Sequence, residues 1–195
     1  QFDDPTADLI NSEFQVNTYA AGSQTAPSIA SLSSGGFVVT WQSYGQDGDD
    51  NGIYGQRYDS SGAASGGEFR VNTVIASSQG DPSVASLSDG GFVVTWESRD
   101  QDSDDNGIYG QRYDGSGAAS GSEFLVNTVT AYGQSNPSVT SLSDGGFVVT
   151  WDSFKSGVGD DIYSQRYDSA GTATGNEFLV NTETSSNQES SSVAS

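Results

Sequence analysis

The sequence predicts an all-β repeat protein made of four-stranded antiparallel units, with β-propeller-like blades as the preferred architecture. Three observations predict it: a repeat of 55 residues, four strand-like segments within each repeat, and turn residues between those segments. A stacked β-solenoid or a string of tandem small β-sandwiches is the alternative, because short repeated strands can also build either of these folds.

A recurring heptapeptide sets the period. GGFVVTW occurs at 35–41, 90–96 and 145–151, so successive copies lie 55 residues apart. The segments EFQVNT, EFRVNT and EFLVNT recur at nearly the same interval, beginning at Glu13, Glu68, Glu123 and Glu177. We therefore divide the chain into the end of a preceding repeat at 1–12, full repeats at 13–67, 68–122 and 123–176, and the first half of a fourth repeat at 177–195.

Each repeat contains four segments with strand character, namely EFLVNT, PSVASLS, GFVVTWES and GIYGQRYD in their commonest forms. All are rich in Val, Ile, Thr or aromatic residues and are bounded by Gly, Pro, Asn, Asp or Ser. In the third segment Phe92, Val94 and Trp96 share one face, and Val93 and Thr95 share the other. Both faces can be buried, so we expect this strand to lie inside a sheet.

Turn residues join the second segment of each repeat to the third. The sequences are SSGG at 33–36 and SDGG at 88–91 and 143–146. Asp-Gly and Gly-Gly favour hairpins because these residues tolerate a positive φ. A closed propeller needs at least about four blades. We therefore expect the terminal half-repeats to mediate self-association, unless the chain belongs to a longer array.

The composition excludes several classes of function. The chain has 195 residues, with 26 Asp and Glu against 6 Lys and Arg, a net charge of −20, and no His, Cys or Met. It therefore lacks an imidazole base, a thiolate nucleophile and the usual His/Cys metal sites. So few basic residues cannot neutralise phosphates, which excludes nucleic acid and anionic membrane surfaces as partners. No apolar run reaches the roughly 18 residues that cross a bilayer, so we expect no membrane insertion.

The same composition bears on location. Strong acidity with little Lys suits an extracellular or cell-surface protein that stays soluble through its charge, and a halophilic cytoplasmic origin is the alternative. The absence of Cys means that stability does not depend on disulfides. Because the chain starts with Gln1 and contains no Met, we expect a processed or internal segment.

An acidic loop recurs in the first two repeats. QDGDDNG at 46–52 and QDSDDNG at 101–107 both carry the pattern D-x-D-x-N-G. Short loops wrap calcium with this spacing, because alternate side chains turn inward and the Gly permits a sharp bend. A divalent cation would also remove the repulsion among neighbouring carboxylates. The candidate calcium ligands are Asp47, Asp49, Asn51, Asp102, Asp104 and Asn106.

The match covers half of a complete calcium loop. Its twelfth position, which should be acidic, is Tyr58 in the first repeat and Tyr113 in the second. An ordinary solvated turn of Asp, Asn and Gly is the alternative interpretation. The third repeat keeps only Asp160 and Asp161 and adds Lys155, so we expect its site to be weak or lost.

Catalysis is weakly indicated. Glu97 or Asp152, each following the repeated Trp, could serve as an acid in glycoside hydrolysis. Gln42 holds the same place in the first repeat, however, and no feature marks a unique cleft. The sequence therefore predicts a protein without enzymatic activity.

Two further sets of repeated residues have structural and functional interpretations. Aromatic residues could stack on glycans if they were exposed, although repetition within Val-rich strands favours core packing; they are Trp41, Trp96, Trp151, Tyr54, Tyr109 and Tyr163. The Arg of the QRYD motif favours structural salt bridges with repeated acids. These are Arg57, Arg112 and Arg166, with Glu68, Glu123, Glu177 or the Asp of the same motif as partners.

The combined pattern SLSDGGFVVTWES…DNGIYGQRYDGSGAASGSEFLVNT resembles a repeat of very large secreted bacterial proteins. These include adhesin-like and hemolysin-type calcium-binding proteins, and the resemblance covers nearly all of residues 13–182. It implies an extracellular, acidic, calcium-associated module of a surface or biofilm protein, with no catalytic residues. The glycine-rich nonapeptide of calcium β-rolls is absent, so calcium depends on the acidic loops alone.

These observations predict an extracellular, calcium-stabilised structural or adhesive repeat module of a bacterial surface, matrix or filament protein. The alternative, from another class of function, is a carbohydrate-binding lectin with one shallow site in each repeat.

Overall fold

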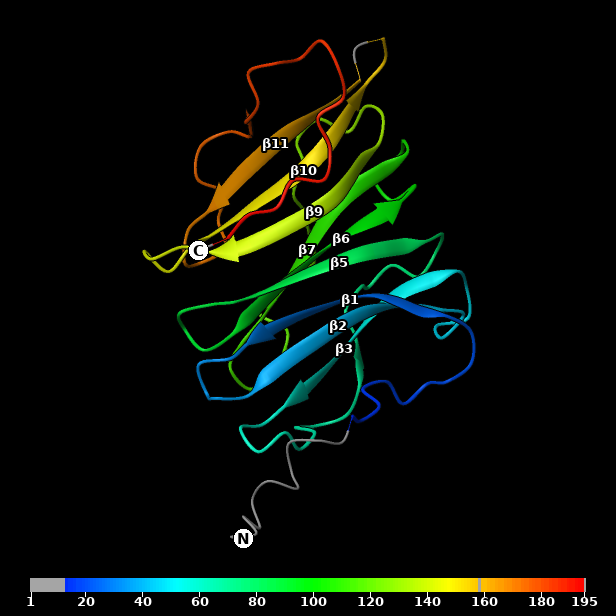
Figure 1. Ribbon diagram of the computed structural model, residues 1–195, viewed down its shortest axis with the longest axis vertical. Coiled ribbons are helices and arrows are strands. Elements are labelled where there is room, and N and C mark those ends of the chain that lie inside the picture. Colours follow the sequence, from blue (N-terminus) through cyan, green and yellow to red (C-terminus); the bar gives the residue numbers. More distant parts are fainter. Residues whose placement is uncertain (1–12, 158, 195) are drawn as a thin grey trace, which may run out of the picture.

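The computed structural model describes residues 13–157 and 159–194, which form three four-stranded antiparallel sheets and no helix (Figure 1). Sheet 1 contains β1 (Gln24–Ser31), β2 (Phe37–Tyr44), β3 (Asn51–Tyr58) and β4 (Phe69–Arg70). Sheet 2 contains β5 (Gln79–Ser86), β6 (Phe92–Arg99), β7 (Asn106–Tyr113) and β8 (Phe124–Leu125). Sheet 3 contains β9 (Gln134–Ser141), β10 (Phe147–Lys155), β11 (Gly159–Tyr167) and β12 (Phe178–Leu179). The predicted four-stranded antiparallel units are confirmed.

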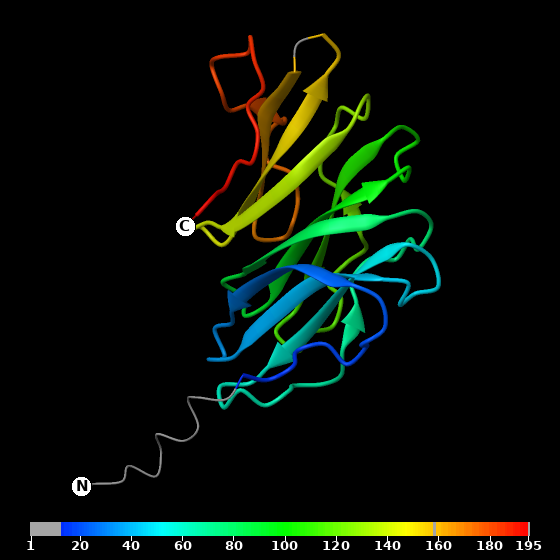
Figure 2. The same cartoon turned by 45° about the vertical axis from the view of Figure 1, so that its right-hand side comes forward.

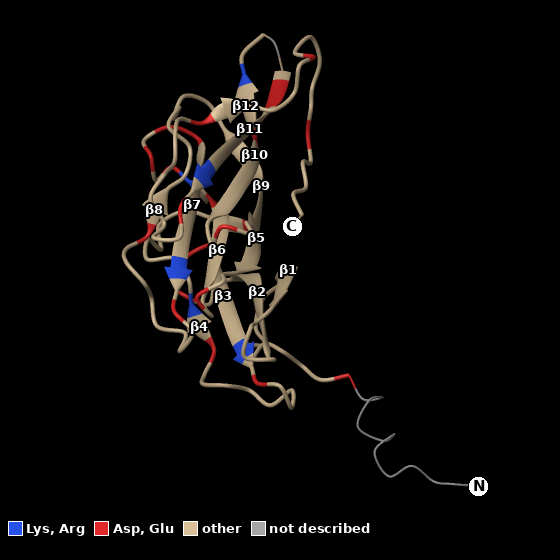
Figure 3. Ribbon diagram, turned by 90° about the vertical axis from the view of Figure 1, so that its left-hand side faces the viewer, with Lys and Arg blue, Asp and Glu red and all other residues tan. Residues whose placement is uncertain are grey.

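The three sheets pack face to face in one row (Figure 2). Their first strands, β1, β5 and β9, lie side by side, and the short fourth strands lie at the opposite edge of each sheet (Figures 1 and 3). No helix capable of crossing a membrane occurs among the described residues.

The middle sheet has two buried faces, as its alternating apolar pattern predicts. Phe92, Val94 and Trp96 of β6 pack in one core with residues of sheet 1, including Val38 and Ile53. The next side chain along, Val93, packs in a second core with Phe147, Val149 and Trp151 of sheet 3. Full burial of an aliphatic or aromatic side chain contributes about 1.5–3 kcal/mol, so these cores hold the sheets together.

The SDGG turn forms the hairpin that its residues predict. Gly90 has a φ of +90°, and Asp89 Oδ1 accepts a hydrogen bond of 2.9 Å from the Gly91 N–H. A Cβ atom on Gly91 would lie 2.1 Å from the Tyr113 carbonyl oxygen. Only glycine lets the turn approach the end of β7 so closely.

The sheet boundaries are offset from the repeat boundaries. The sequence division opens each repeat with the EF segment, whereas the structure pairs Phe69–Arg70 with β3 as the last strand of sheet 1. β4 has two residues, and after it the Val71 N–H and the Asn72 side chain both bind the backbone of Ile53 in β3. The proposed repeat end at 1–12 lies outside the described residues.

The segment 188–194 follows sheet 3 in the place of a further first strand. Its Val193 N–H donates to Ser138 Oγ at 3.2 Å, as the Val84 N–H donates to Ser28 Oγ and the Val139 N–H donates to Ser83 Oγ. The segment contains no assigned strand, and the EF segment before it, expected to open a fourth repeat, forms β12 of sheet 3.

Candidate functional site

The residue after each repeated Trp joins its sheet to the next one. Its side-chain oxygen accepts a hydrogen bond from a backbone N–H of the following sheet or segment, and each donor residue has a positive φ between 48° and 62°. The pairs are Gln42 with Asp81 at 3.0 Å, Glu97 with Asn136 at 2.7 Å, and Asp152 with Ser190 at 2.8 Å. These contacts fix the edges along which neighbouring sheets meet.

Asn72 and Asn127, from the VNT motifs that follow sheets 1 and 2, also join neighbouring sheets. Asn72 Oδ1 accepts a 2.7 Å hydrogen bond from the Ile53 N–H of sheet 1. Its Nδ2 donates to Val74 O at 2.7 Å and to Gln79 Oε1, at the start of sheet 2, at 3.0 Å. Asn72 is 2% exposed, so its amide acts as a buried bridge between the sheets. Sequence reasoning gave no role to this residue, although its recurrence in VNT was the available signal.

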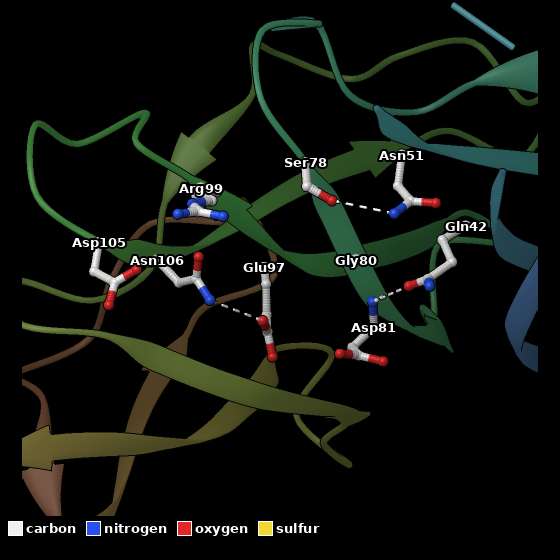
Figure 4. Close-up of a pocket in the computed structure, with 9 residues that line it drawn as sticks. All are labelled: Gln42, Asn51, Ser78, Gly80, Asp81, Glu97, Arg99, Asp105 and Asn106. Carbon is white, nitrogen blue, oxygen red and sulfur yellow. Dashed lines mark hydrogen bonds between the residues drawn. The ribbon is translucent and has the colours of Figure 1, made fainter. Parts of the chain in front are cut away.

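A polar pocket with a volume of about 450 Å³ lies at the junction of sheets 1 and 2 (Figure 4). Gln42 and Asn51 line it from sheet 1, while the rest of its wall comes from sheet 2 and the segment that leads into β5. Asn51 Nδ2 donates to Ser78 Oγ at 3.2 Å across the junction. The ionisable side chains of its wall are Asp81, Glu97, Arg99 and Asp105.

The pKa of Glu97 is raised to about 7, chiefly by burial and to a smaller extent by the charges of Asp81, Asp152 and Asp105, while the hydrogen bond from the Asn136 N–H opposes the shift. Asn106 Nδ2 donates to the second Glu97 oxygen at 3.3 Å. Both carboxyl oxygens of Glu97 therefore have partners within the protein. Arg99 points outward, with 62% of its side chain exposed and its nearest carboxylate, that of Asp100, 3.7 Å away.

The predicted calcium residues of the first loop occupy the sheet 1–sheet 2 junction. Asp49 Oδ2 accepts a hydrogen bond of 3.2 Å from the Ser77 N–H, and Asn51 contacts Ser78 as described above. In the second loop, Asp104 Oδ2 accepts a hydrogen bond of 3.0 Å from the Tyr132 N–H, and Asn106 contacts Glu97. Within residues 13–157 and 159–194 no three acidic side chains group as a metal site. Calcium binding stays a prediction.

The first residue of each acidic loop behaves differently. The Oδ2 atoms of Asp47 and Asp102 are buried and have no hydrogen-bond partner. Each lies against the glycine that ends its loop: a Cβ on Gly52 would be 2.5 Å from Asp47 Oδ2, and one on Gly107 would be 2.6 Å from Asp102 Oδ2. A side chain in place of either glycine would clash with the carboxylate, so the packing of the carboxylate requires glycine at this position.

In the third repeat, a buried carboxylate has partners from the same repeat and from the segment after it. Asp161 stands where the first two repeats have that glycine. Its Oδ1 accepts a 2.8 Å hydrogen bond from Asn181, and its Oδ2 lies 3.4 Å from Lys155 Nζ. Lys155 also donates to the Tyr163 hydroxyl at 2.5 Å, and hydrogen bonding to that hydroxyl and to Asp161 raises the pKa of the Lys155 ammonium. The third repeat therefore pairs its buried carboxylate with an ammonium, whereas the other repeats leave theirs unpaired.

The repeated aromatic and basic residues are structural. Trp41, Trp96 and Trp151 are at most 3% exposed, which confirms core packing and removes them as stacking surfaces for glycans. The predicted pairing of Arg57 and Arg112 with the EF glutamates is wrong. Their guanidinium groups donate to backbone carbonyls of the next sheet's loop, including those of Gly115 and Ser169. Structural salt bridges do form at two of the three arginines, but with turn aspartates: Arg112 pairs with Asp89 and Arg166 with Asp144. The glutamates bind elsewhere, since Glu68 and Glu123 accept from the backbone N–H and hydroxyl of Thr18 and Thr73, and Glu177 accepts from the Thr128 N–H.

Comparison with solved structures finds the same fold in proteins of low sequence identity. A Hadza microbial sialidase, Hz136, superposes with a TM-score of 0.61 and 11% identity, covering 81% of this chain and 37% of its own. The endo-arabinase from Bacteroides thetaiotaomicron VPI-5482 gives 0.54 and 20% identity, covering 87% and 66%. The alpha-L-arabinofuranosidase from Lactobacillus brevis gives 0.52 and 13% identity, covering 80% and 53%. The chain thus spans less than two thirds of these relatives. No family model and no curated protein matches the chain.

Proposed function

We propose that this chain is a non-catalytic carbohydrate-binding module of an extracellular bacterial protein, with its three sheets as blades of an incomplete β-propeller. The pocket between sheets 1 and 2 carries the proposal. Its amide, hydroxyl, carboxyl and guanidinium groups are those that recognise sugar hydroxyls by hydrogen bonding. The structural relatives named above act on carbohydrates according to their names, which supports this choice of ligand class.

The charges of the pocket favour a neutral or amino sugar. Three carboxyl groups, those of Asp81, Glu97 and Asp105, share the wall with a single guanidinium, that of Arg99, so acidic groups outnumber basic ones. A sugar that carries a carboxylate would be repelled, because like charges in a partly desolvated site cost binding free energy. We therefore place neutral and amino glycans ahead of acidic ones.

The partners of Glu97 support a binding role over catalysis. A general acid must reach the leaving oxygen of its substrate, whereas both Glu97 oxygens hold protein groups. Gln42 performs the same junction role in sheet 1, and an amide cannot donate the proton. We propose that the raised pKa of Glu97 is a consequence of its position between the sheets.

A glycan array tests the proposal. We expect wild-type protein to bind neutral or amino glycans in preference to sialylated and uronic acid glycans. Replacing Arg99 with Ala should weaken binding to the best neutral glycan about tenfold, because a charge-assisted hydrogen bond contributes about 1.5–3 kcal/mol. Arg70→Ala, which removes an exposed cation of β4 away from the pocket, is the control. Equal loss in both variants, or no glycan binding at all, would contradict the assignment.

A second candidate is a calcium-stabilised adhesive or structural repeat. The unpaired Oδ2 atoms of Asp47 and Asp102 favour it, because a buried carboxylate oxygen without a partner is unfavourable and a cation would stabilise it. Lys155 fills the corresponding role in the third repeat. Asp47, Asp49 and Asn51 would hold the ion in the first loop, and the equivalent residues would hold it in the second.

Calcium should therefore raise the thermal stability of the protein. A ligand that binds only the folded state stabilises it by RT ln(1+[L]/Kd), about 1.4 kcal/mol at a tenfold excess over Kd. Melting is measured with millimolar calcium and with chelator, in wild type, in Asp47→Asn/Asp102→Asn and in the control Asp160→Asn. Calcium should stabilise wild type and the control, but not the double variant. The same melting temperature for wild type in calcium and in chelator would reject the loops as calcium sites.

A further inference from the structure

Two exposed aromatic side chains lie together at the junction of sheets 2 and 3. Tyr132 precedes β9 and is 48% exposed, and Phe154 lies near the end of β10 and is 44% exposed. Their rings meet edge to face, with centroids 6.0 Å apart and an interplanar angle of 86°. Aromatic rings that are half exposed gain only part of the free energy of burial, so core packing does not account for them.

The backbone at this place does not need aromatic side chains. In sheet 2 the residues equivalent to Tyr132 and Phe154 are Ser77 and Arg99. The Ser77 N–H binds Asp49 Oδ2 just as the Tyr132 N–H binds Asp104 Oδ2. The Arg99 N–H donates to Ser78 O at 3.0 Å, and the Phe154 N–H donates to Gly133 O at the same distance. The turn therefore forms without either ring.

Tyr132 also occupies an unfavourable backbone conformation. Its φ is +66°, and the equivalent residues are Gly22, with a φ of +70°, and Ser77, with a φ of +61°. Left-handed φ values disfavour bulky side chains, and glycine adopts them without steric cost. A large aromatic residue at this position is more consistent with a use for the ring than with a requirement of the fold.

The geometry points to a stacking site for a sugar ring, and we infer that Tyr132 and Phe154 bind the apolar C–H face of a neutral pyranose. This inference rests on the proposed carbohydrate-binding function. The electron-rich faces of aromatic rings attract the weakly positive C–H groups of such a sugar face. The site is the repeat equivalent of the polar pocket: Phe154 stands in the place of Arg99, which lines that pocket. Hydrogen bonding at one junction and stacking at the next would let one glycan chain contact both.

Removal of the two rings tests the inference. The variant Tyr132→Ser/Phe154→Ser removes both rings and adds no charged group to the junction. Tyr132→Gly, which introduces the residue found at the equivalent Gly22, removes one ring and relieves the positive φ, so it should keep or raise the melting temperature. Val129→Ala, which shortens an exposed apolar side chain nearby, is the matched control.

Binding of cellohexaose, xylohexaose and chitohexaose is measured by titration calorimetry and by saturation-transfer NMR. We expect wild type and Val129→Ala to transfer saturation to sugar ring C–H protons. The double variant should bind roughly three- to tenfold more weakly, in line with the contribution of an aromatic contact, and should transfer less saturation to these protons. Tyr132→Gly, which removes one of the two rings, should show a smaller decrease in affinity and in saturation transfer.

Three results would overturn the inference. Unchanged affinity and saturation transfer in the double variant, together with weaker binding by Arg99→Ala, would reject the stacking site and leave the proposed function standing. Equal loss in Val129→Ala would assign the effect to general disturbance of the junction. Absence of binding by wild type to all three probes, with no binding on the glycan array, would reject both the inference and the proposed function.

Discussion

Replacing Asn127 with Ala is expected to lower the free energy of unfolding by about 3–5 kcal/mol. Its Oδ1 accepts from the Ile108 N–H at 2.7 Å, and its Nδ2 donates to Val129 O at 2.9 Å and Gln134 Oε1 at 3.0 Å. Asn127 is 2% exposed, so alanine would leave the buried Ile108 N–H and Gln134 Oε1 without this partner. Each unsatisfied buried group costs about 1–3 kcal/mol, which makes this loss large.

The third repeat provides the control for this substitution. Asn181 accepts the equivalent hydrogen bond from the Ile162 N–H at 2.7 Å, but it is only half-buried and its Nδ2 contacts Asp161 and Glu183. The Asp161 carboxylate that Asn181 contacts keeps Lys155 as a partner, and Asn181 does not reach a following sheet, so Asn181→Ala should cost less than half as much as Asn127→Ala. Urea denaturation followed by tryptophan fluorescence measures both. Equal effects would show that the Asn bridge does not join the sheets.

Replacing Glu97 with Gln is expected to stabilise the protein above pH 7 and to leave it unchanged near pH 4. The pKa of Glu97 is raised from 4.5 to about 7 by burial, so folded Glu97 keeps a proton that the unfolded chain loses between these values. The free energy of unfolding of wild type therefore falls as the pH rises through this window, by about 2–3 kcal/mol at most. Glutamine has no such titration, and Gln42 shows that it can accept the same backbone hydrogen bond.

The measurement is the difference between variant and wild type in urea denaturation at pH 4, 5.5 and 8, which cancels the titration of other groups. The difference should grow with pH and level off above pH 7. The reciprocal variant Gln42→Glu should introduce a loss of stability in the same direction at the sheet 1–sheet 2 junction. A pH-independent difference for Glu97→Gln would mean that the pKa of Glu97 is the same in the folded and the unfolded protein.

The sequence repeat predicted the sheets because the conformation of strands and turns depends on neighbouring residues. Alternation in GFVVTWES places Phe92 and Trp96 on one face and Val93 on the other, and this is where the two cores form. The turns that contain Gly-Gly were also predicted from the sequence, since the positive φ at Gly90 depends only on the residues of the turn. The burial of the repeated Trp residues followed from the same alternation.

Hydrogen bonds between residues that lie far apart in the chain could not be predicted from local sequence patterns. The spacing of the acidic loops predicted contacts within each loop. In the structure, Asp49 and Asp104 also accept hydrogen bonds from residues 28 positions further along. Arg57 and Arg112 bind carbonyl groups 57 to 59 positions away, and Arg112 and Arg166 pair with Asp89 and Asp144 in place of the predicted glutamates. Spacing predicts contacts within a turn, whereas these contacts depend on how one sheet faces the next.

Side-chain alternation and turn chemistry act over a few residues, so the repeated antiparallel sheets and their buried Trp residues follow from the sequence alone. That β4 closes the sheet before it, and that Gln42 and Glu97 line one pocket, depends on the three-dimensional packing. The contact between Tyr132 and Phe154 at a junction depends on it as well. Packing between sheets buries one particular set of faces and edges. This packing, and the hydrogen bonds that buried polar groups require, makes residues of different repeats neighbours. A pattern within a few residues of sequence does not specify these contacts.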